Sequence, residues 1–172
     1  MLIRVEIPVD AAGIDRLLRN AFPSSEEAEL VHRLREDGLL TLGVVATDEE
    51  GGVIGYAAFS PVYVDGEDRQ CVGLAPVVVD EAHRRQGLAE QIIYEGLDSL
   101  NEFGYSAVVV LGEPAYFSRF GFQNAAQQGL RSHLPGTEDS FLVYPLAGGE
   151  MENCKGVVEY SAPFGRSEST TF

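Results

Sequence analysis

The first quarter of the chain changes from strand-like to helix-like spacing of its hydrophobic residues. Residues 2–7 alternate in the manner of a β-strand. Over residues 10–22 the apolar side chains recur at helical spacing and so share one face. A second helix is predicted to begin at a capping box made by Ser24 and Glu27 and to end at Gly38. We therefore expect one strand followed by two helices.

Three long strands are predicted next. Segments 39–47, 53–64 and 69–79 are largely apolar and rich in β-branched residues. The two connections between them are short and rich in Asp, Glu and Gly, which is typical of tight turns. Strands joined in this way pair as an antiparallel meander.

The spacing becomes helical again after the meander. Residues 88–104 place their apolar side chains on one face, and segment 107–111 is apolar on both faces, as expected of a buried strand. A strand, a helix and a strand in succession predict a right-handed crossover with parallel pairing. A short helix over 114–120 and strands over 141–146 and 156–160 complete the predicted order. The fold class is therefore α/β with a mixed sheet.

Length and charge narrow the possibilities. The chain has 172 residues and a formal net charge of −15, with a single lysine. This length fits one domain, which we expect over residues 1–160, followed by a loose tail over 161–172. So acidic a surface repels phosphate backbones and anionic lipids, which argues against nucleic acid and membranes as partners. It favours a cationic substrate, although solubility alone would also explain the charge.

The cysteines indicate a reducing compartment. Cys71 and Cys154 are the only two, and they stand far apart in a chain that shows no secretory signal. We therefore expect free thiols and a cytoplasmic location, not a disulfide framework. Without a cluster of cysteines and histidines, no metal site is expected.

The connection between strand 69–79 and helix 88–104 carries the strongest candidate site. A helix N-terminus has unpaired N–H groups and a partial positive charge, so it binds anions. Here Gly87 and Ala89 leave room for a pyrophosphate, and Arg84 and Arg85 add positive charge. Residue type alone leaves a second interpretation open, in which Gly87 only permits a turn and the arginines are solvated. No dinucleotide fingerprint and no P-loop sequence is present.

Resemblance to a family favours the first interpretation. Segment 84–89, Arg-Arg-Gln-Gly-Leu-Ala, resembles the Gln/Arg-x-x-Gly-x-Gly/Ala motif of the GNAT superfamily of N-acetyltransferases. Segment 74–80 resembles the central strand of that fold. Similarity to the YhbS-like bacterial members of the superfamily is closest at residues 34–38, 94–105 and 118–122. The resemblance extends over nearly the whole chain, up to about Tyr160.

The resemblance implies a mixed, mostly antiparallel sheet whose central parallel strands splay apart, with helices on its flanks. It implies acetyl-CoA, or coenzyme A, as cosubstrate, with the pantetheine arm along the strand backbone and the pyrophosphate on the helix N-terminus. It also implies the residues that bind this cosubstrate: Val77, Val78, Val79, Arg84, Arg85, Gln86, Gly87, Leu88, Ala89 and Phe117. Many relatives of this fold pair as dimers, so a homodimer is an open expectation.

The implied reaction moves an acetyl group to an amine of a small molecule or a protein. In the superfamily a tyrosine four residues before the glycine of a Gly-Phe pair protonates the departing sulfur. Gly121 supplies that glycine here, but the tyrosine position holds Phe117, and Tyr116 is one residue earlier. Tyr116 is our candidate acid and Glu113 our candidate base. Water could replace the acid.

Two other functions stay open. The chain could bind acyl-CoA without catalysis, as a regulatory module, and the phenylalanine at position 117 is the main argument for this. It could also keep only the fold, as a partner-binding domain without affinity for coenzyme A.

Overall fold

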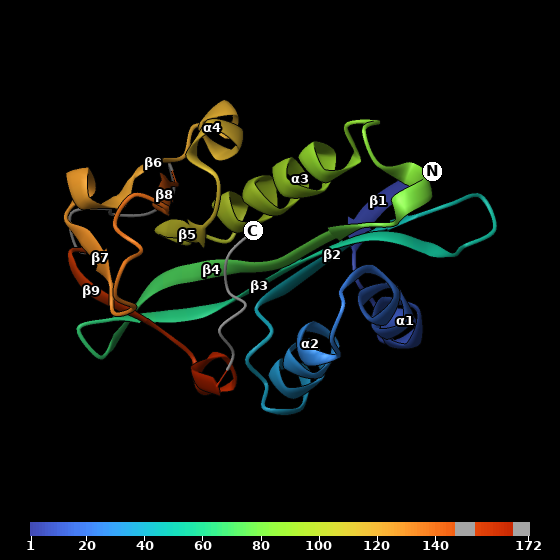
Figure 1. Cartoon of the computed structure of the whole chain (residues 1–172), viewed down its shortest axis with the longest axis horizontal. Coiled ribbons are helices and arrows are strands. Elements are labelled where there is room, and N and C mark those ends of the chain that lie inside the picture. The colour runs from blue at the N-terminus through green and yellow to red at the C-terminus, as the bar shows by residue number, and fades with distance from the viewer. Residues whose placement is uncertain (147–153, 167–172) are drawn as a thin grey trace.

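One mixed β-sheet runs through the molecule (Figure 1). The computed structural model describes residues 1–146 and 154–166. The strands in this part of the chain are β1 (Leu2–Val5), β2 (Leu42–Thr47), β3 (Val53–Val64), β4 (Glu67–Val79), β5 (Ala107–Leu111), β6 (Gln123–Asn124), β7 (Leu130–Ser132), β8 (Phe141–Pro145) and β9 (Gly156–Tyr160). Their order is β1-β2-β3-β4-β5-β8-β6, and β9 pairs with both β3 and β7.

Helices cover both faces of the sheet. The α-helices of the described chain are α1 (Ala11–Ala21), α2 (Glu26–Glu36), α3 (Leu88–Glu102) and α4 (Pro114–Phe117). Short 3-10 helices are η1 (Pro8–Asp10), η2 (Glu81–His83), η3 (Ser118–Phe120), η4 (Ala125–Gln128) and η6 (Ala162–Arg166). In Figure 1, α3 lies on one face of the sheet, whereas α1 and α2 lie on the other.

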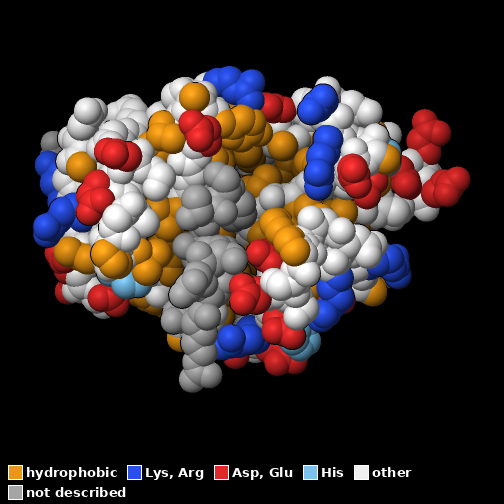
Figure 2. Space-filling view, in the orientation of Figure 1, with side chains coloured by type: hydrophobic (Ala, Val, Ile, Leu, Met, Phe, Trp, Pro, Cys, Tyr) orange, Lys and Arg blue, Asp and Glu red, His pale blue; other side chains and the backbone are white. Residues whose placement is uncertain are grey.

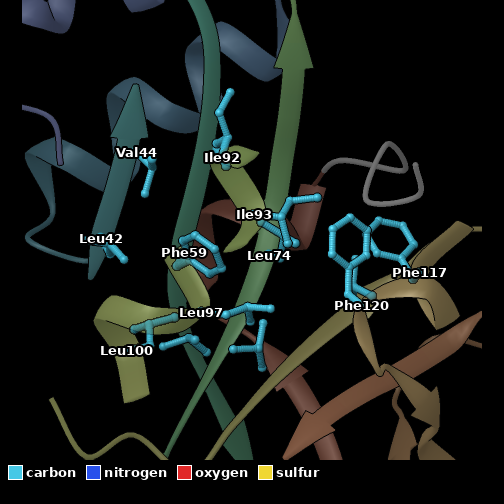
Figure 3. Packing of buried hydrophobic residues seen from close by; sticks show 14 of the residues in the cluster. Leu42, Val44, Phe59, Leu74, Ile92, Ile93, Leu97, Leu100, Phe117 and Phe120 are labelled. Carbon is cyan, nitrogen blue, oxygen red and sulfur yellow. The ribbon is translucent and has the colours of Figure 1, made fainter. Parts of the chain in front are cut away.

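The alternation of side chains along the central strands divides the core between these two faces. Phe59 of β3 and Leu74 of β4 pack with Ile92 of α3 (Figure 3). Their neighbours on β3, Tyr56 and Ala58, point the other way and pack with residues of α1 and α2. Both faces of the central strands are therefore buried, which explains why their sequences are apolar almost throughout.

The predicted α/β fold is confirmed. The strands β3, β5 and β9 have the bounds that the sequence predicted, and β1 through β4 pair antiparallel. The predicted parallel pairing of β4 with β5 is present, with α3 as the crossover helix. The very short β6 and β7 were not predicted, because two or three residues carry no measurable periodicity.

The strands β4 and β5 pair over only part of their length. Cys71 to Gly73 are aligned with Ala107 to Val109. The strand β4 then continues to Val79, and its residues 74–79 have no partner on β5. The sheet therefore opens between these strands, as the family resemblance implied.

The predicted capping box at the start of α2 is wrong. The helix begins at Glu26, with Ser25 as its N-cap, and the hydroxyl of Ser24 accepts a 3.3 Å hydrogen bond from the Glu26 N–H. Glu27 does not reach back to cap the helix, because it lies on the buried face and only 8% of it is exposed.

The residues after Tyr160 begin in an ordered way, although a loose tail was expected over 161–172. The 3-10 helix η6 follows directly, and Phe164 is buried within it. Its ring centroid lies 5.1 Å from that of Tyr160, and this apolar contact fixes the segment against the core. Residues 167–172 lie outside the described part of the chain.

The two cysteines meet inside the molecule despite their distance in the sequence. The Sγ atoms of Cys71 and Cys154 lie 3.0 Å apart, and both side chains are buried free thiols. The hydrogen bond between them raises the pKa of Cys71, as does burial, and lowers the pKa of Cys154 to about 7. Sequence spacing could not reveal this contact, because the sheet brings β4 and the residues before β9 together.

Candidate active site

A cavity of about 650 Å³ lies at the N-terminus of α3. It is lined by Val79, His83, Arg84, Arg85, Gly87, Leu88, Ala89, Glu90, Tyr116 and Arg119. On the face seen in Figure 2, hydrophobic side chains gather over the region of α3 and α4, and Lys or Arg side chains stand on either side of them. The cavity therefore joins the end of β4, the start of α3 and the helix that follows β5.

The backbone at the start of α3 is turned sharply. Arg85 has a φ of +66° and Gly87 a φ of +75°. A Cβ atom on Gly87 would come no closer than 3.7 Å to another atom, the Oε2 of Glu90, so the space beside it is open. Within residues 1–146 and 154–166, the N–H groups from Arg85 to Ala89 donate to no protein acceptor. A row of free amides at the N-terminus of a long helix is suited to binding an anion.

Side chains attach this loop to the end of β4. The Nε of Arg84 donates to the carbonyl oxygen of Val79 at 3.1 Å. Just before it, His83 Nδ1 lies 3.1 Å from Asp80 Oδ2. These contacts hold the loop in position, and Arg85 is exposed beside the free amides.

Tyr116 of α4 also lines the cavity. The guanidinium of Arg119 lies 4.6 Å from the centre of its ring and also forms a 3.0 Å ion pair with Glu90. Burial and the nearby Glu90 carboxylate raise the pKa of Tyr116. Its hydroxyl is therefore protonated at neutral pH and can donate a proton.

Phe117 lies in the core, not in the cavity. Only 2% of it is exposed, and it packs against Phe120 (Figure 3). Its ring also contacts that of Phe122, with 5.5 Å between the centroids. Consecutive helical residues point about 100° apart, so the same turn that buries Phe117 directs Tyr116 into the cavity. Tyr116 therefore lines the cavity, whereas Phe117 does not.

Glu113 is exposed at the start of α4. Its carbonyl oxygen accepts hydrogen bonds from the N–H groups of Tyr116 and Phe117, at 3.1 Å and 3.0 Å. The residue therefore has a structural role as the N-cap, and it is absent from the residues that line the cavity.

The structure brings most of the predicted binding residues together. Those that line the cavity are Val79, Arg84, Arg85, Gly87, Leu88 and Ala89. Val77 and Val78 belong to the part of β4 that has no partner on β5, and Gln86 is exposed beside the loop. Sequence reasoning missed Glu90 and Arg119. Glu90 could have been found from its place directly after Ala89, but nothing in the sequence indicated that Arg119 would meet it.

Two features are absent from the described residues. Over the residues that the structure describes, no three His, Cys, Asp or Glu side chains are placed to share a metal ion. The same residues include no helix with the length and apolar character needed to cross a membrane.

Comparison with known proteins identifies the family. The model of the acetyltransferase (GNAT) family matches residues 11–122. The chain is 64% identical over 166 residues to the uncharacterized N-acetyltransferase YhbS of Escherichia coli K12, covering 96% of this chain and 99% of that protein.

Two solved structures extend the comparison. The crystal structure of YhbS from Escherichia coli in complex with CoA has a TM-score of 0.91 at 63% identity, and covers 96% of this chain and 92% of that one. A GNAT family acetyltransferase from Brucella melitensis in complex with acetyl-CoA has a TM-score of 0.77 at 34% identity, over 95% and 97% of the two chains. With the open sheet and the free amides before α3, these matches show that the chain belongs to the acetyltransferase (GNAT) family.

Proposed function

We propose that this chain is an N-acetyltransferase that moves an acetyl group from acetyl-CoA to an amine of a small molecule or a protein. The acyltransferase class follows from the family. The observation that carries the cosubstrate assignment is the row of free N–H groups from Arg85 to Ala89, at the mouth of the opening between β4 and β5. The two similar proteins crystallised with CoA and acetyl-CoA support the same assignment.

The residues present fit coenzyme A. Its pyrophosphate would rest on the free amides, beside the positive charge of Arg84 and Arg85. Its pantetheine arm would lie along Val77 to Val79. It would form hydrogen bonds with backbone groups of β4 that have no partner on β5, as a peptide does when it adds to a sheet edge. The bound cosubstrate supplies an activated acetyl thioester.

The chain itself supplies orientation and a proton. The splayed strand holds the thioester where an amine can reach it, and exposed backbone N–H groups of β4 can stabilise the carbonyl oxygen as it gains charge. Tyr116 donates its hydroxyl proton to the sulfur as the carbon–sulfur bond breaks. The Glu90–Arg119 pair beside it fixes the position of the tyrosine ring.

An amine panel tests the proposal. We expect the wild-type protein to release free thiol from acetyl-CoA only when an amine is added, with one acetylated amine formed for each thiol. Tyr116→Phe should lower turnover about 10- to 100-fold and leave acetyl-CoA affinity unchanged. Tyr94→Phe is the matched control, because Tyr94 is half exposed and packs against Phe120 outside the cavity lining.

The outcomes separate the alternatives. Calorimetric binding of acetyl-CoA without thiol release on any amine would favour the regulatory module. Binding weaker than millimolar would leave only a partner-binding domain. Equal turnover in Tyr116→Phe and wild type would remove Tyr116 as the acid and leave water in that role. The expected cytoplasmic location and the homodimer stay predictions.

A further inference from the structure

The two buried cysteines take no part in the proposed reaction, yet their thiols are in contact. The Sγ atoms of Cys71 and Cys154 lie 3.0 Å apart, although 83 positions separate the two residues in the chain. Neither residue lines the cavity at the N-terminus of α3. Both belong to the hydrophobic cluster that includes Leu30 of α2, on the other face of the sheet. Binding of the cosubstrate therefore does not explain the contact between the thiols.

The fold places the two sulfur atoms close to bonding distance. The S–S length of a disulfide is about 2.05 Å, so the two Sγ atoms would have to approach each other by only about 1 Å. A side-chain movement of this size leaves the strands in place. The native fold is therefore already arranged for a bond between these two cysteines.

A bulge in β4 holds the thiols side by side. The register between β3 and β4 shifts directly before Cys71, and Gln70 has a φ of +59° at this point. The carbonyl oxygen of Arg69 lies 3.8 Å from the Sγ of Cys71 and 3.5 Å from the Sγ of Cys154. One backbone acceptor thus faces both sulfur atoms, which fixes their positions relative to each other.

The two thiols differ in reactivity. The thiol of Cys71 donates a hydrogen bond to the sulfur of Cys154, and this bond lowers the pKa of Cys154 to about 7. The same contact raises the pKa of Cys71, and burial raises it further. Oxidants react with the thiolate, so Cys154 is the nucleophile and Cys71 is the thiol that resolves the intermediate.

Both cysteines are buried next to exposed residues. At most 1% of either side chain is exposed, whereas Gln70 and Lys155, their neighbours in sequence, lie on the surface. Hydrogen peroxide is little larger than water, so a local opening of the chain is enough to admit it. The depth of the two thiols therefore favours a small oxidant over a bulky one.

We infer that Cys71 and Cys154 are a modification site, at which a hydroperoxide such as hydrogen peroxide forms a reversible intramolecular disulfide that stabilises the fold. Cys154 loses its proton, and its sulfur attacks one peroxide oxygen. The O–O bond breaks, a sulfenic acid forms, and the leaving hydroxide takes up a proton to become water. The sulfur of Cys71 then attacks the sulfenic sulfur. An S–S bond forms, and the displaced hydroxide leaves as water with the proton of Cys71.

The electrons and atoms of this sequence balance. The two thiols lose two electrons and two hydrogen atoms, and one hydrogen peroxide becomes two water molecules. Thiol reductants of the cytoplasm would reverse the reaction by thiol–disulfide exchange, so the disulfide would be transient in that compartment. This inference does not depend on which amine the protein acetylates.

The disulfide acts on stability and not on the cosubstrate site. It ties β4 to the residue that precedes β9 by two positions, and it closes a long loop. Closing such a loop restricts the unfolded chain, so we expect a rise in Tm of about 5–10 °C. Cys71 lies in the part of β4 that is paired with β5. Acetyl-CoA affinity should therefore stay within about 2-fold of that of the reduced protein.

Peptide mapping tests the bond directly. The folded wild-type protein is treated with a few equivalents of hydrogen peroxide, then denatured, alkylated with iodoacetamide and cut with trypsin. We expect a disulfide between peptides 70–84 and 132–155, each of which contains one of the cysteines. Differential scanning calorimetry of the oxidised protein should show the rise in Tm, and dithiothreitol should reverse both results.

Cys71→Ala and Cys154→Ala are the matched controls. Neither variant should give a linked peptide or a rise in Tm after peroxide treatment. If neither variant folds, wild type with and without dithiothreitol supplies the comparison. The inference is overturned if both thiols stay open to alkylation, if the cysteines are oxidised separately to sulfinic acid, or if disulfides form only between molecules. A linked peptide with unchanged Tm would overturn the stabilising effect.

Discussion

The two faces of the central sheet differ in where their unpartnered polar groups come from. On the α3 side, they are the main-chain amides from Arg85 to Ala89, where Gly87 leaves open space. On the α2 side, they are buried side-chain oxygens of Glu27, Ser60, Tyr160 and Ser161. The first group is contiguous in sequence, whereas the second comes from separate segments of the chain.

This difference has consequences for substitution. A backbone site tolerates many side chains but not a bulky one at its tightest point. Buried oxygens without a partner tolerate isosteric removal, because the folded protein loses no hydrogen bond. Variants on the α3 side should therefore alter the affinity for acetyl-CoA, whereas removal of an unpartnered hydroxyl on the α2 side should leave stability nearly unchanged.

The largest expected effect is on the α3 side. Gly87→Trp fills the space beside the free amides. We expect it to weaken acetyl-CoA binding at least about 100-fold, which is the effect of losing two hydrogen bonds to a charged phosphate. Gly104→Trp is the matched control. Gly104 has a φ of +81°, close to the +75° of Gly87, and lies at the other end of α3. Calorimetry should find its affinity within about 3-fold of wild type, and a similar loss in both variants would assign the effect to backbone strain.

The next effect contrasts two buried tyrosines on the α2 side. Tyr160→Phe removes a hydroxyl without a partner in the described chain, so we expect unchanged or slightly higher stability. Tyr56→Phe removes a hydroxyl that donates to Glu6 at 2.6 Å, so it should lose about 1–3 kcal/mol of unfolding free energy. Urea unfolding measures both. Equal destabilisation would show that Tyr160 has a protein partner.

A smaller effect on acetyl-CoA affinity is expected from the positive charge of Arg85 beside the free amides. Arg85→Gln should weaken acetyl-CoA binding about 5-fold at low ionic strength, because the arginine is exposed and its attraction for phosphate is partly screened. The difference from wild type should shrink as salt is added. Arg131→Gln, which changes an exposed arginine on β7, should bind as wild type does at every salt concentration. A salt-independent loss in Arg85→Gln would point to a packing role instead.

The smallest expected effect is on the pH dependence of kcat. The pKa of Tyr116 is raised, so the protonated form that donates to sulfur persists to higher pH than for an ordinary tyrosine. The kcat of the wild type should therefore show no alkaline decline attributable to this group up to about pH 10. A decline centred near pH 8 that disappears in Tyr116→Phe would contradict the assignment.

The same contrast explains what the sequence could and could not predict. Hydrophobic spacing predicted β3, β5 and α3 closely, because each buries whole faces that leave a clear period. The loop of Arg85 to Ala89 was predictable since its chemistry depends on consecutive residues. Glu27 was interpreted as a capping residue, because its sequence neighbourhood fits a capping box and only the packing of α2 buries it.

The position of the hydroxyl in the cavity was equally beyond the sequence. Counting back from Gly121 reached Phe117, and only the structure shows that Tyr116 lines the cavity while Phe117 lies in the core. Likewise, Arg119 meets Glu90 across a gap of 29 residues that no local pattern records. Contacts between distant segments depend on how the elements pack, and a single sequence contains no direct signal for them.

The central claim is that main-chain amides before α3 hold the diphosphate of coenzyme A. A crystal structure of this protein with CoA tests it most directly. We expect pyrophosphate oxygens at hydrogen-bond distances, about 2.7–3.2 Å, from several of the nitrogen atoms of Arg85 to Ala89. A bound CoA whose diphosphate lies elsewhere, with those N–H groups facing only solvent, would contradict the account.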